Sequence, residues 1–312
     1  MNTIRFPIES DWPSLCQRPK HDYRALFEHV SPILERIRQE GDRACKVLTE
    51  KYDGVSLSDF RVPHEDLAHA TDAVGEELRQ AIATAADNIE KFHRSQLESQ
   101  VSVETMPGVT CWRKAVPIER VGLYIPGGTA PLLSTILMLG VPAKIAGCAE
   151  VVLCTPPTQK GQIDAAMLYA AHEVGIHRVF KLGGAQAIGA MAYGTDTIPR
   201  VDKIFGPGNS YVTAAKLLVQ QDGVAIDMPA GPSELVVLAD KTCEPAFVAA
   251  DLLSQAEHGE DSQVLLITDS ADVIDTVELE VQRQLAELPR QDIAQVALNN
   301  LSLIHISEPT RL

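Results

Sequence analysis

Six short apolar runs between residues 121 and 268 constrain the fold of this chain more than any other feature. Each run is followed by a loop and then by a segment whose apolar residues have helical spacing. Strands buried on both faces are continuously apolar, and strands that alternate with helices form parallel sheets. The sequence therefore predicts an α/β fold with parallel sheets flanked by helices. The runs cover residues 121–125, 151–154, 179–182, 203–205, 235–239 and 264–268.

The first hundred residues have a different pattern. Apolar residues recur at helical spacing over residues 23–52 and again over residues 65–99, where alanine is frequent. Such stripes are typical of helices that bury one face. We therefore expect a helical N-terminal region that supplies core packing and no binding site.

Composition and charge narrow the class of protein. The 312 residues are 45% hydrophobic and carry a formal net charge of −15, which is typical of a soluble globular protein and disfavours nucleic-acid binding. We predict no membrane span, because no apolar stretch has the required length, and no signal peptide. The six cysteines have no CxxC spacing, so we expect reduced thiols in a cytoplasmic protein, or a plastid protein whose transit peptide is missing.

Three glycine-rich loops follow predicted strands, at residues 124–131, 183–189 and 206–210. Glycine lets a backbone approach a ligand closely, and the helix that follows directs free N–H groups at the loop. Each loop also carries a polar side chain: Tyr124, Gln186 or Asn209. None of the loops matches GxGxxG, and a strand-to-helix turn needs glycine in any case. Three such loops at one sheet edge nevertheless favour a nucleotide site.

Gln255 and His258 form a second candidate site near the end of a predicted helix that opens at Pro245. At a spacing of i, i+3 their side chains would share one helix face, and imidazole and carboxamide oxygen can both bind zinc. The alternative is that His258 caps the helix C-terminus beside Gly259. A catalytic zinc needs at least three protein ligands, and this stretch offers two.

Two further hypotheses come from other classes of function. Cys111 or Cys148 could act as the nucleophile of a thiol-dependent aldehyde dehydrogenase, although neither has a histidine nearby in sequence. The chain could also be a nucleotide-binding module without catalysis. Replacing each cysteine by serine would separate the thiol mechanism from the zinc mechanism.

Five motifs together resemble the histidinol dehydrogenase family, in the family's order. The resemblance covers roughly residues 20 to 300, and the motifs are too long to match by chance. They are ERVGLYIPGG at 119–128, KLGGAQAI at 181–188, VDKIFGPGN at 201–209, DMPAGPSE at 227–234 and DLLSQAEHG at 251–259.

The resemblance implies specific roles. Positions 124, 186 and 209 match the family's NAD contacts, and Ser233, Gln255 and His258 match its contacts to L-histidinol. Gln255 and His258 also match two of the four zinc ligands, a site that could accept manganese or cobalt instead. The implied reaction oxidises L-histidinol to L-histidine in two NAD-dependent steps through the aldehyde. The full-length protein is expected to be a homodimer.

The resemblance also implies a domain division. Residues 1–19 would be an N-terminal extension, and residues 20–123 plus 235–300 a discontinuous first domain. Residues 124–234 would form an incomplete Rossmann-like domain that contacts NAD. We interpret residues 301–312, LSLIHISEPTRL, as a non-native tail, because they resemble read-through of a cloning or sequencing adapter. The alternative is a genuine short strand, but the alternation of these residues leaves no clean apolar face.

The chain departs from the family at its catalytic machinery. The family's Glu-His pair lies in a Pro-Glu-His motif, which does not occur in this sequence. His305 and Glu308 should not be taken for that pair, so we assign no catalytic residue. The polypeptide is expected to bind NAD weakly and zinc poorly, and not to turn over histidinol.

Overall fold

The computed structural model describes residues 2–17, 23–97, 99, 101–127, 131–229, 234–260 and 262–306. The chain divides into two compact units. The larger unit comprises Asp22–Pro229, and the smaller unit comprises Met1–His21 together with Ala230–Leu312. Each unit contains its own parallel sheet.

The sheet of the larger unit has five parallel strands in the order β6-β5-β4-β7-β8. The chain runs from β4 outwards to β6, then returns to the other side of β4 to add β7 and β8. The strand order therefore reverses between β4 and β7, the position at which open α/β sheets bind ligands. The four strands predicted here are confirmed. The bounds are β4 Arg120–Tyr124, β5 Glu150–Thr155, β6 Arg178–Lys181, β7 Lys203–Phe205 and β8 Ala225–Ile226.

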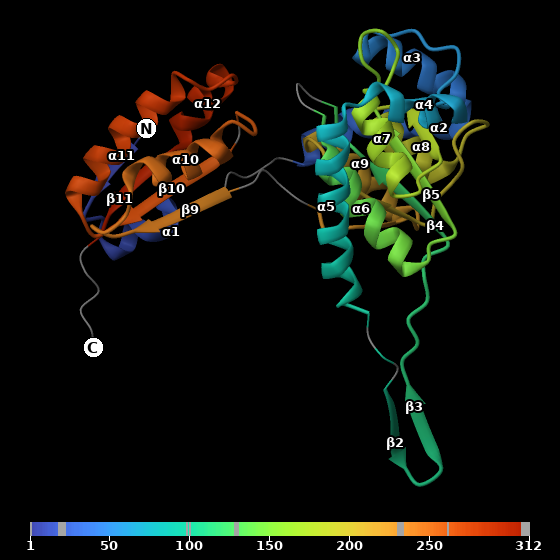
Figure 1. The fold of residues 1–312 in the computed structure, drawn as a ribbon, viewed down its shortest axis with the longest axis horizontal. Coiled ribbons are helices and arrows are strands. Elements are labelled where there is room, and N and C mark those ends of the chain that lie inside the picture. The colour runs from blue at the N-terminus through green and yellow to red at the C-terminus, as the bar shows by residue number, and fades with distance from the viewer. Residues whose placement is uncertain are drawn as a thin grey trace. The chain divides into compact units, whose positions relative to one another are not determined.

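Helices cover both faces of this sheet (Figure 1). Val152 and Cys154 face one core cluster, whereas Leu153 between them faces the other, as the twofold period of a strand requires. The first face is covered by α2 Tyr23–Glu40, α3 Asp42–Asp53, α8 Gly184–Tyr193 and α9 Ser210–Gln221. The second is covered by α4 His64–Ala73, α5 Glu76–Arg94, α6 Leu133–Ala146 and α7 Ala165–Glu173.

Each long apolar stripe at the N-terminus forms two helices rather than one. Gly41 separates α2 from α3 with φ +55°, a conformation that few other residues adopt. Val74 is extended and Gly75 is the N-cap of α5, which separates it from α4. The apolar spacing in sequence continued across both breaks, so periodicity alone did not locate them.

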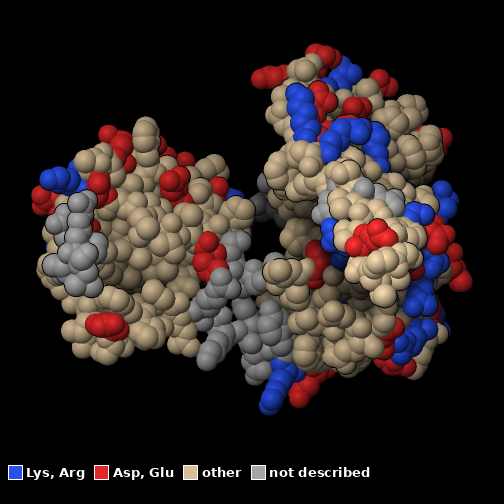
Figure 2. All heavy atoms as spheres, turned by 90° about the horizontal axis from the view of Figure 1, so that it is seen from below, with Lys and Arg blue, Asp and Glu red and all other residues tan. Residues whose placement is uncertain are grey.

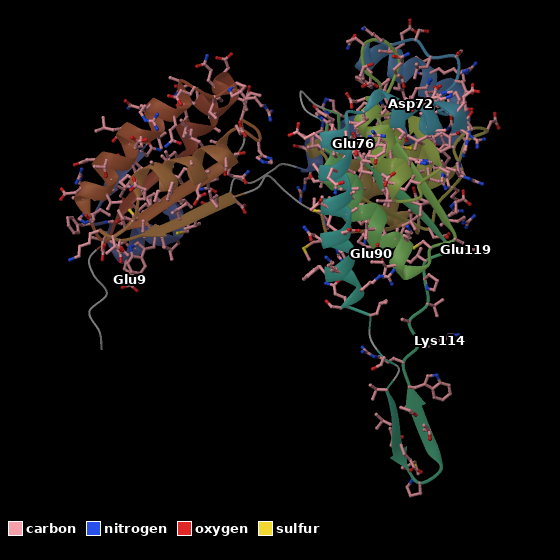
Figure 3. The ribbon with its side chains drawn as sticks, in the orientation of Figure 1. Glu9, Asp72, Glu76, Glu90, Lys114 and Glu119 are labelled. Carbon is pink, nitrogen blue, oxygen red and sulfur yellow. The ribbon has the colours of Figure 1, made fainter. Side chains whose placement is uncertain are left out.

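A hairpin of β2 Ser102–Met106 and β3 Val109–Trp112 projects from the larger unit (Figure 1). Every residue of the two strands is exposed. The sequence analysis did not predict this hairpin. Lys114 lies on the segment that leads from β3 back to β4, and Glu76 and Glu90 lie on α5 (Figure 3).

The smaller unit has four parallel strands in the order β1-β11-β10-β9. Helices α10, α11 and α12 pack against one face of this sheet and form its core. The strands are β1 Asn2–Arg5, β9 Glu234–Ala239, β10 Gln263–Thr268 and β11 Ser302–His305. The helices are α1 Trp12–Leu15, α10 Pro245–Ala256, α11 Ala271–Leu285 and α12 Gln291–Ala297, with short 3-10 helices at Glu9–Asp11 and Leu298–Asn300.

The alternative of a short strand, which the sequence disfavoured for residues 301–312, is confirmed for Ser302–His305. These residues form β11, which pairs with β1 on one side and β10 on the other. Leu303, Ile304 and His305 are all buried. Leu303 and Ile304 point to opposite faces of the sheet, so β11 is buried on both of its faces and needs no alternation. Residues 307–312 lie outside the described residues, and the non-native origin of the tail stays a prediction.

The two units also differ from the expected domains. The helical region at residues 23–94 packs on the sheet of residues 120–226 and falls in the same compact unit as that sheet, whereas the resemblance implied a domain shared with residues 235–300. The apolar stripes of α2 and α5 are buried against helices of the larger unit, which gives the reason for this grouping.

Among the described residues, no helix is both long and apolar enough to span a bilayer. Acidic and basic side chains are interspersed on the face that Figure 2 shows. The surplus of acidic residues thus does not gather into one patch on that face.

Candidate functional site

The loops that follow β4 and β6 both pack on Pro156, the residue that follows β5. A Cβ added at Gly127 would lie 2.4 Å from Pro156 Cγ, and one added at Gly183 would lie 2.5 Å from Pro156 Cβ. Glycine is therefore required at both positions for the loops to pack on the proline. The close approach is a packing contact between loops, which is the structural alternative that the sequence left open.

Tyr124 ends β4 at the reversal of strand order and is only 3% exposed. Its hydroxyl oxygen accepts a hydrogen bond of 3.0 Å from the backbone N–H of Gly184 at the start of α8. Burial raises the pKa of Tyr124 to about 12, and the hydrogen bond from Gly184 opposes this shift. The phenol therefore stays protonated and joins the ends of β4 and β6.

Gln186 lies in the first turn of α8 and is 2% exposed. Its Nε2 donates a hydrogen bond of 3.2 Å to Oδ2 of Asp53, the last residue of α3. Gly184 has φ +60°, and a Cβ there would lie 2.7 Å from Gln186 Oε1. Burial raises the pKa of Asp53, and the Gln186 hydrogen bond lowers it. In the sequence Asp53 is interpreted only as part of a turn, since nothing there links it to Gln186.

Asn209 is exposed and is the N-cap of α9. Its Oδ1 accepts a hydrogen bond of 3.1 Å from the backbone N–H of Val212. This is the ordinary role of asparagine at a helix N-terminus. The third loop is therefore held by its own cap, and the side chain of Asn209 reaches solvent beside it.

Lys216 and Asp227 hold the loop between β7 and α9, and the sequence analysis assigned neither to a site. Lys216 Nζ donates to the carbonyl oxygen of Gly206 over 2.9 Å and pairs with Asp227 Oδ1. Asp227 Oδ2 accepts from the N–H of Gly206 over 2.8 Å. Gly206 has φ +130°, and a Cβ there would lie 2.0 Å from the carbonyl oxygen of Tyr124.

Gln255 and His258 lie in the smaller unit, at the end of α10. The helix ends at Ala256 with Glu257 as C-cap, so His258 lies in the turn that follows, and the shared face of the two side chains stays a prediction. The N–H of His258 donates to the carbonyl oxygen of Gln255 over 3.2 Å. The side-chain Nε2 of Gln255 is buried with no hydrogen-bond partner among the described residues.

These two side chains suit a zinc ion in their donor chemistry. A carboxamide binds a metal through its oxygen, and the exposed imidazole of His258 offers a nitrogen, whereas the unpartnered Nε2 of Gln255 is an N–H donor and does not bind metal. No group of three or more His, Cys, Asp or Glu residues placed to hold a metal occurs among the described residues. Ser233, the third predicted substrate contact, lies outside the described residues.

The family's sequence profile, described as Histidinol dehydrogenase, matches residues 16–311. The chain belongs to the histidinol dehydrogenase family. A histidinol dehydrogenase of Bacteroides thetaiotaomicron is 55% identical over 308 residues, which cover 99% of this chain and 72% of that protein. One of Xanthomonas euvesicatoria is 57% identical over 89% of this chain and 64% of its own length. The family assigns the chain to the oxidoreductases of histidine biosynthesis.

A solved structure agrees with this assignment. The crystal structure of histidinol dehydrogenase from Elizabethkingia anophelis is similar with a TM-score of 0.94 at 52% identity, covering 99% of this chain and 71% of that chain. The fold of parallel sheets flanked by helices is thus that of a histidinol dehydrogenase.

The cysteines do not support a thiol mechanism. Cys111 is exposed on the projecting hairpin, where its Sγ lies 4.0 Å from Thr105 Oγ1. Burial raises the pKa of the Cys148 thiol, which disfavours the thiolate that a nucleophile needs.

Proposed function

We propose that this chain carries the NAD-binding and much of the substrate-binding part of a histidinol dehydrogenase. The reaction would oxidise L-histidinol to the aldehyde and then oxidise the hydrated aldehyde to L-histidine, with one NAD reduced in each step. The observation that supports it best is the hydrogen-bonded set at the reversal of strand order, where Tyr124 and Gln186 lie at a ligand-binding edge.

Tyr124, Gln186 and Asn209 would contact NAD in this proposal. Tyr124 and Gln186 are held by hydrogen bonds to Gly184 and Asp53, so they would be positioned before the cofactor arrives. Asn209 would use the part of its side chain that the helix cap leaves free. The Rossmann-like character of the unit is part of the same proposal.

Gln255, His258 and Ser233 would contact the substrate, and Gln255 and His258 would also bind zinc. A zinc ion bound there would hold the imidazole and amino group of histidinol in place. The residue types support this, because the amide oxygen of Gln255 and an imidazole nitrogen of His258 are both atoms that can bind zinc. Two donors alone hold zinc loosely, so we expect weak binding by this polypeptide.

The test is NADH formation from L-histidinol with added zinc, compared with an intact family member. The polypeptide lacks the family's Pro-Glu-His motif. Loss of a general base typically costs about 100- to 10,000-fold in rate. We therefore expect a rate at least about 100-fold below the intact enzyme. A rate closer to that of the intact enzyme would contradict the expected loss of turnover, while NADH binding tests the cofactor assignment separately.

The alternative hypothesis from the sequence is a nucleotide-binding module without catalysis. Titration with NADH and with histidinol separates the two. Binding of NADH alone supports the module, whereas binding of histidinol that depends on zinc and on His258 supports the dehydrogenase.

The cytoplasmic location and the homodimeric state of the full-length protein are further parts of the proposal. Sedimentation equilibrium would test the dimer.

A further inference from the structure

Lys216 is a buried lysine with a specific target. It lies in the second turn of α9, is 5% exposed, and its ammonium group reaches back to a residue ten positions earlier in the chain. Side chains on a helix point towards its N-terminus, which brings the ammonium over the loop that precedes α9. Burying a charged ammonium is costly unless it is paired and hydrogen-bonded.

The partners of Lys216 meet this requirement through one residue. The ammonium binds the carbonyl oxygen of Gly206 and one oxygen of the Asp227 carboxylate, and the other Asp227 oxygen binds the N–H of Gly206. Both polar groups of the Gly206 backbone are thereby held by the same ion pair. Asp227 itself follows β8, and its N–H donates to the carbonyl oxygen of Ile204 in β7.

Gly206 is the point at which this ion pair touches the candidate site. It holds φ +130°, and its α-carbon packs so closely on the carbonyl of Tyr124 that a side chain has no room. The loop continues through Pro207 and Gly208 to Asn209. The ion pair thus joins α9, β8 and the end of β7, and sets where this loop lies relative to Tyr124.

We propose that Lys216 and Asp227 are positioning residues for the nucleotide, and that they hold the 206–209 loop in the geometry that receives it beside Tyr124. This inference deepens the proposed function and rests on it. Neither side chain needs to touch the nucleotide. The ion pair instead fixes the backbone of a loop whose glycines would otherwise allow many conformations.

A purely structural ion pair would predict a different outcome, and Arg120 with Asp202 provides the matched control. Arg120 binds Asp202 through two nitrogens, with 2.8 Å between NH2 and Oδ1, at the amino ends of the same two strands, β4 and β7. Replacing Arg120 removes one ion pair from the same sheet but leaves the loops at the carboxyl ends of its strands intact.

The experiment titrates NADH into the full 312-residue chain and its Lys216→Met and Arg120→Met variants, and measures the melting temperature of each. We expect Lys216→Met to weaken NADH binding by about 10- to 100-fold, as happens when a residue that orients a metal ligand is lost. Arg120→Met should leave the NADH affinity unchanged. Equal weakening in both variants, or weakening that only follows the loss of melting temperature, would overturn the proposal.

Hydrogen exchange gives a second measurement that does not depend on NADH. In the unmodified chain the amide of Gly206 should be protected, and in Asp227→Asn or Lys216→Met the amides of Gly206, Gly208 and Asn209 should exchange faster while those inside α9 do not. Faster exchange throughout the unit would mean that the pair only stabilises the fold, and an unprotected Gly206 amide in the unmodified chain would also contradict the proposal.

The two measurements separate the two claims. If the unmodified chain does not bind NADH, the proposed function fails, and with it the nucleotide role of the ion pair. If NADH binds but the loop exchanges equally in the unmodified and Lys216→Met chains, the positioning role alone fails.

Discussion

The side-chain amide of Gln186 donates a hydrogen bond to the carboxylate of Asp53 over 3.2 Å, and this bond links α8 to the end of α3. The two residues are 133 positions apart in the chain. Gln186 is a predicted NAD contact. Its hydrogen bond to Asp53 therefore fixes the orientation of an amide group at the candidate site. The carboxylate is half-buried, and burial raises its pKa above the ordinary value of 3.8.

This raised pKa gives a stability prediction with a definite sign. A raised pKa means that the folded state favours the protonated carboxyl of Asp53. The stability that this carboxyl contributes is fully present below the unfolded-state pKa and is lost as pH rises through the folded-state pKa. Asparagine at position 53 cannot ionise, so the Asp53→Asn variant does not lose this stability as pH rises. Its amide oxygen can still accept the hydrogen bond from Gln186. The free energy of unfolding of the variant relative to the unmodified chain should therefore increase as pH rises from below 3.8 to neutral.

Urea denaturation at a series of pH values measures this difference. Asp202→Asn is the control, because hydrogen bonding to Arg120 lowers the pKa of Asp202. Its stabilising contribution is present above the unfolded-state pKa and lost as pH falls, so the control should show the opposite slope. The same slope in both variants would contradict the assignment of Asp53.

Gly206→Ala should be strongly destabilising. The new Cβ would meet the carbonyl oxygen of Tyr124 at 2.0 Å, and backbone atoms cannot turn away as a flexible side chain can. We expect a loss of more than about 3 kcal/mol in the free energy of unfolding, measured by urea denaturation followed by circular dichroism. Gly223→Ala is the control, since Gly223 also has positive φ but has no atom within 4 Å of the added Cβ. It should cost only about 1–2 kcal/mol.

Tyr124→Phe should leave the N–H of Gly184 without its acceptor at a partly buried position. Such a donor typically costs about 1–3 kcal/mol, and the NADH affinity should fall as the ends of β4 and β6 separate. Tyr193→Phe is the control, because the Tyr193 hydroxyl donates to an exposed Asp222 carboxylate that can bind water instead. If both variants lose the same stability in urea, the buried hydrogen bond has no special role.

Leu303→Ala should destabilise the smaller unit. Leu303 is 0% exposed and lies in β11 between two neighbouring strands, so its truncation should cost about 2–5 kcal/mol. Leu238→Ala in β9 of the same sheet is the control, since Leu238 is 76% exposed and should cost less than about 0.5 kcal/mol.

A Trp112→Phe background isolates this measurement. The chain has two tryptophans, and with Trp112 of the larger unit replaced, Trp12 alone reports unfolding of the smaller unit. An unchanged midpoint for Leu303→Ala would mean that β11 contributes nothing to that sheet.

Much of the fold follows from the sequence because the signals involved are local. A buried parallel strand such as β5 has a continuous run of apolar residues, and the helices that cover it have apolar residues at helical spacing. The motifs around Tyr124, Gln186 and Asn209 lie at strand ends for the same reason, since strand-to-helix loops need glycine. These features depend only on residues a few positions apart.

Tertiary structure decided the rest, because the remaining contacts join distant residues. Nothing near Gln186 in sequence predicts that Asp53 is its partner, and nothing near Gly206 predicts that Lys216 and Asp227 hold its backbone. The grouping of the N-terminal helices with residues 120–226 depends on which apolar faces meet, which periodicity does not encode. The strand at Ser302–His305 forms because neighbours on both sides satisfy its backbone and bury its side chains, and those neighbours are far away in the chain.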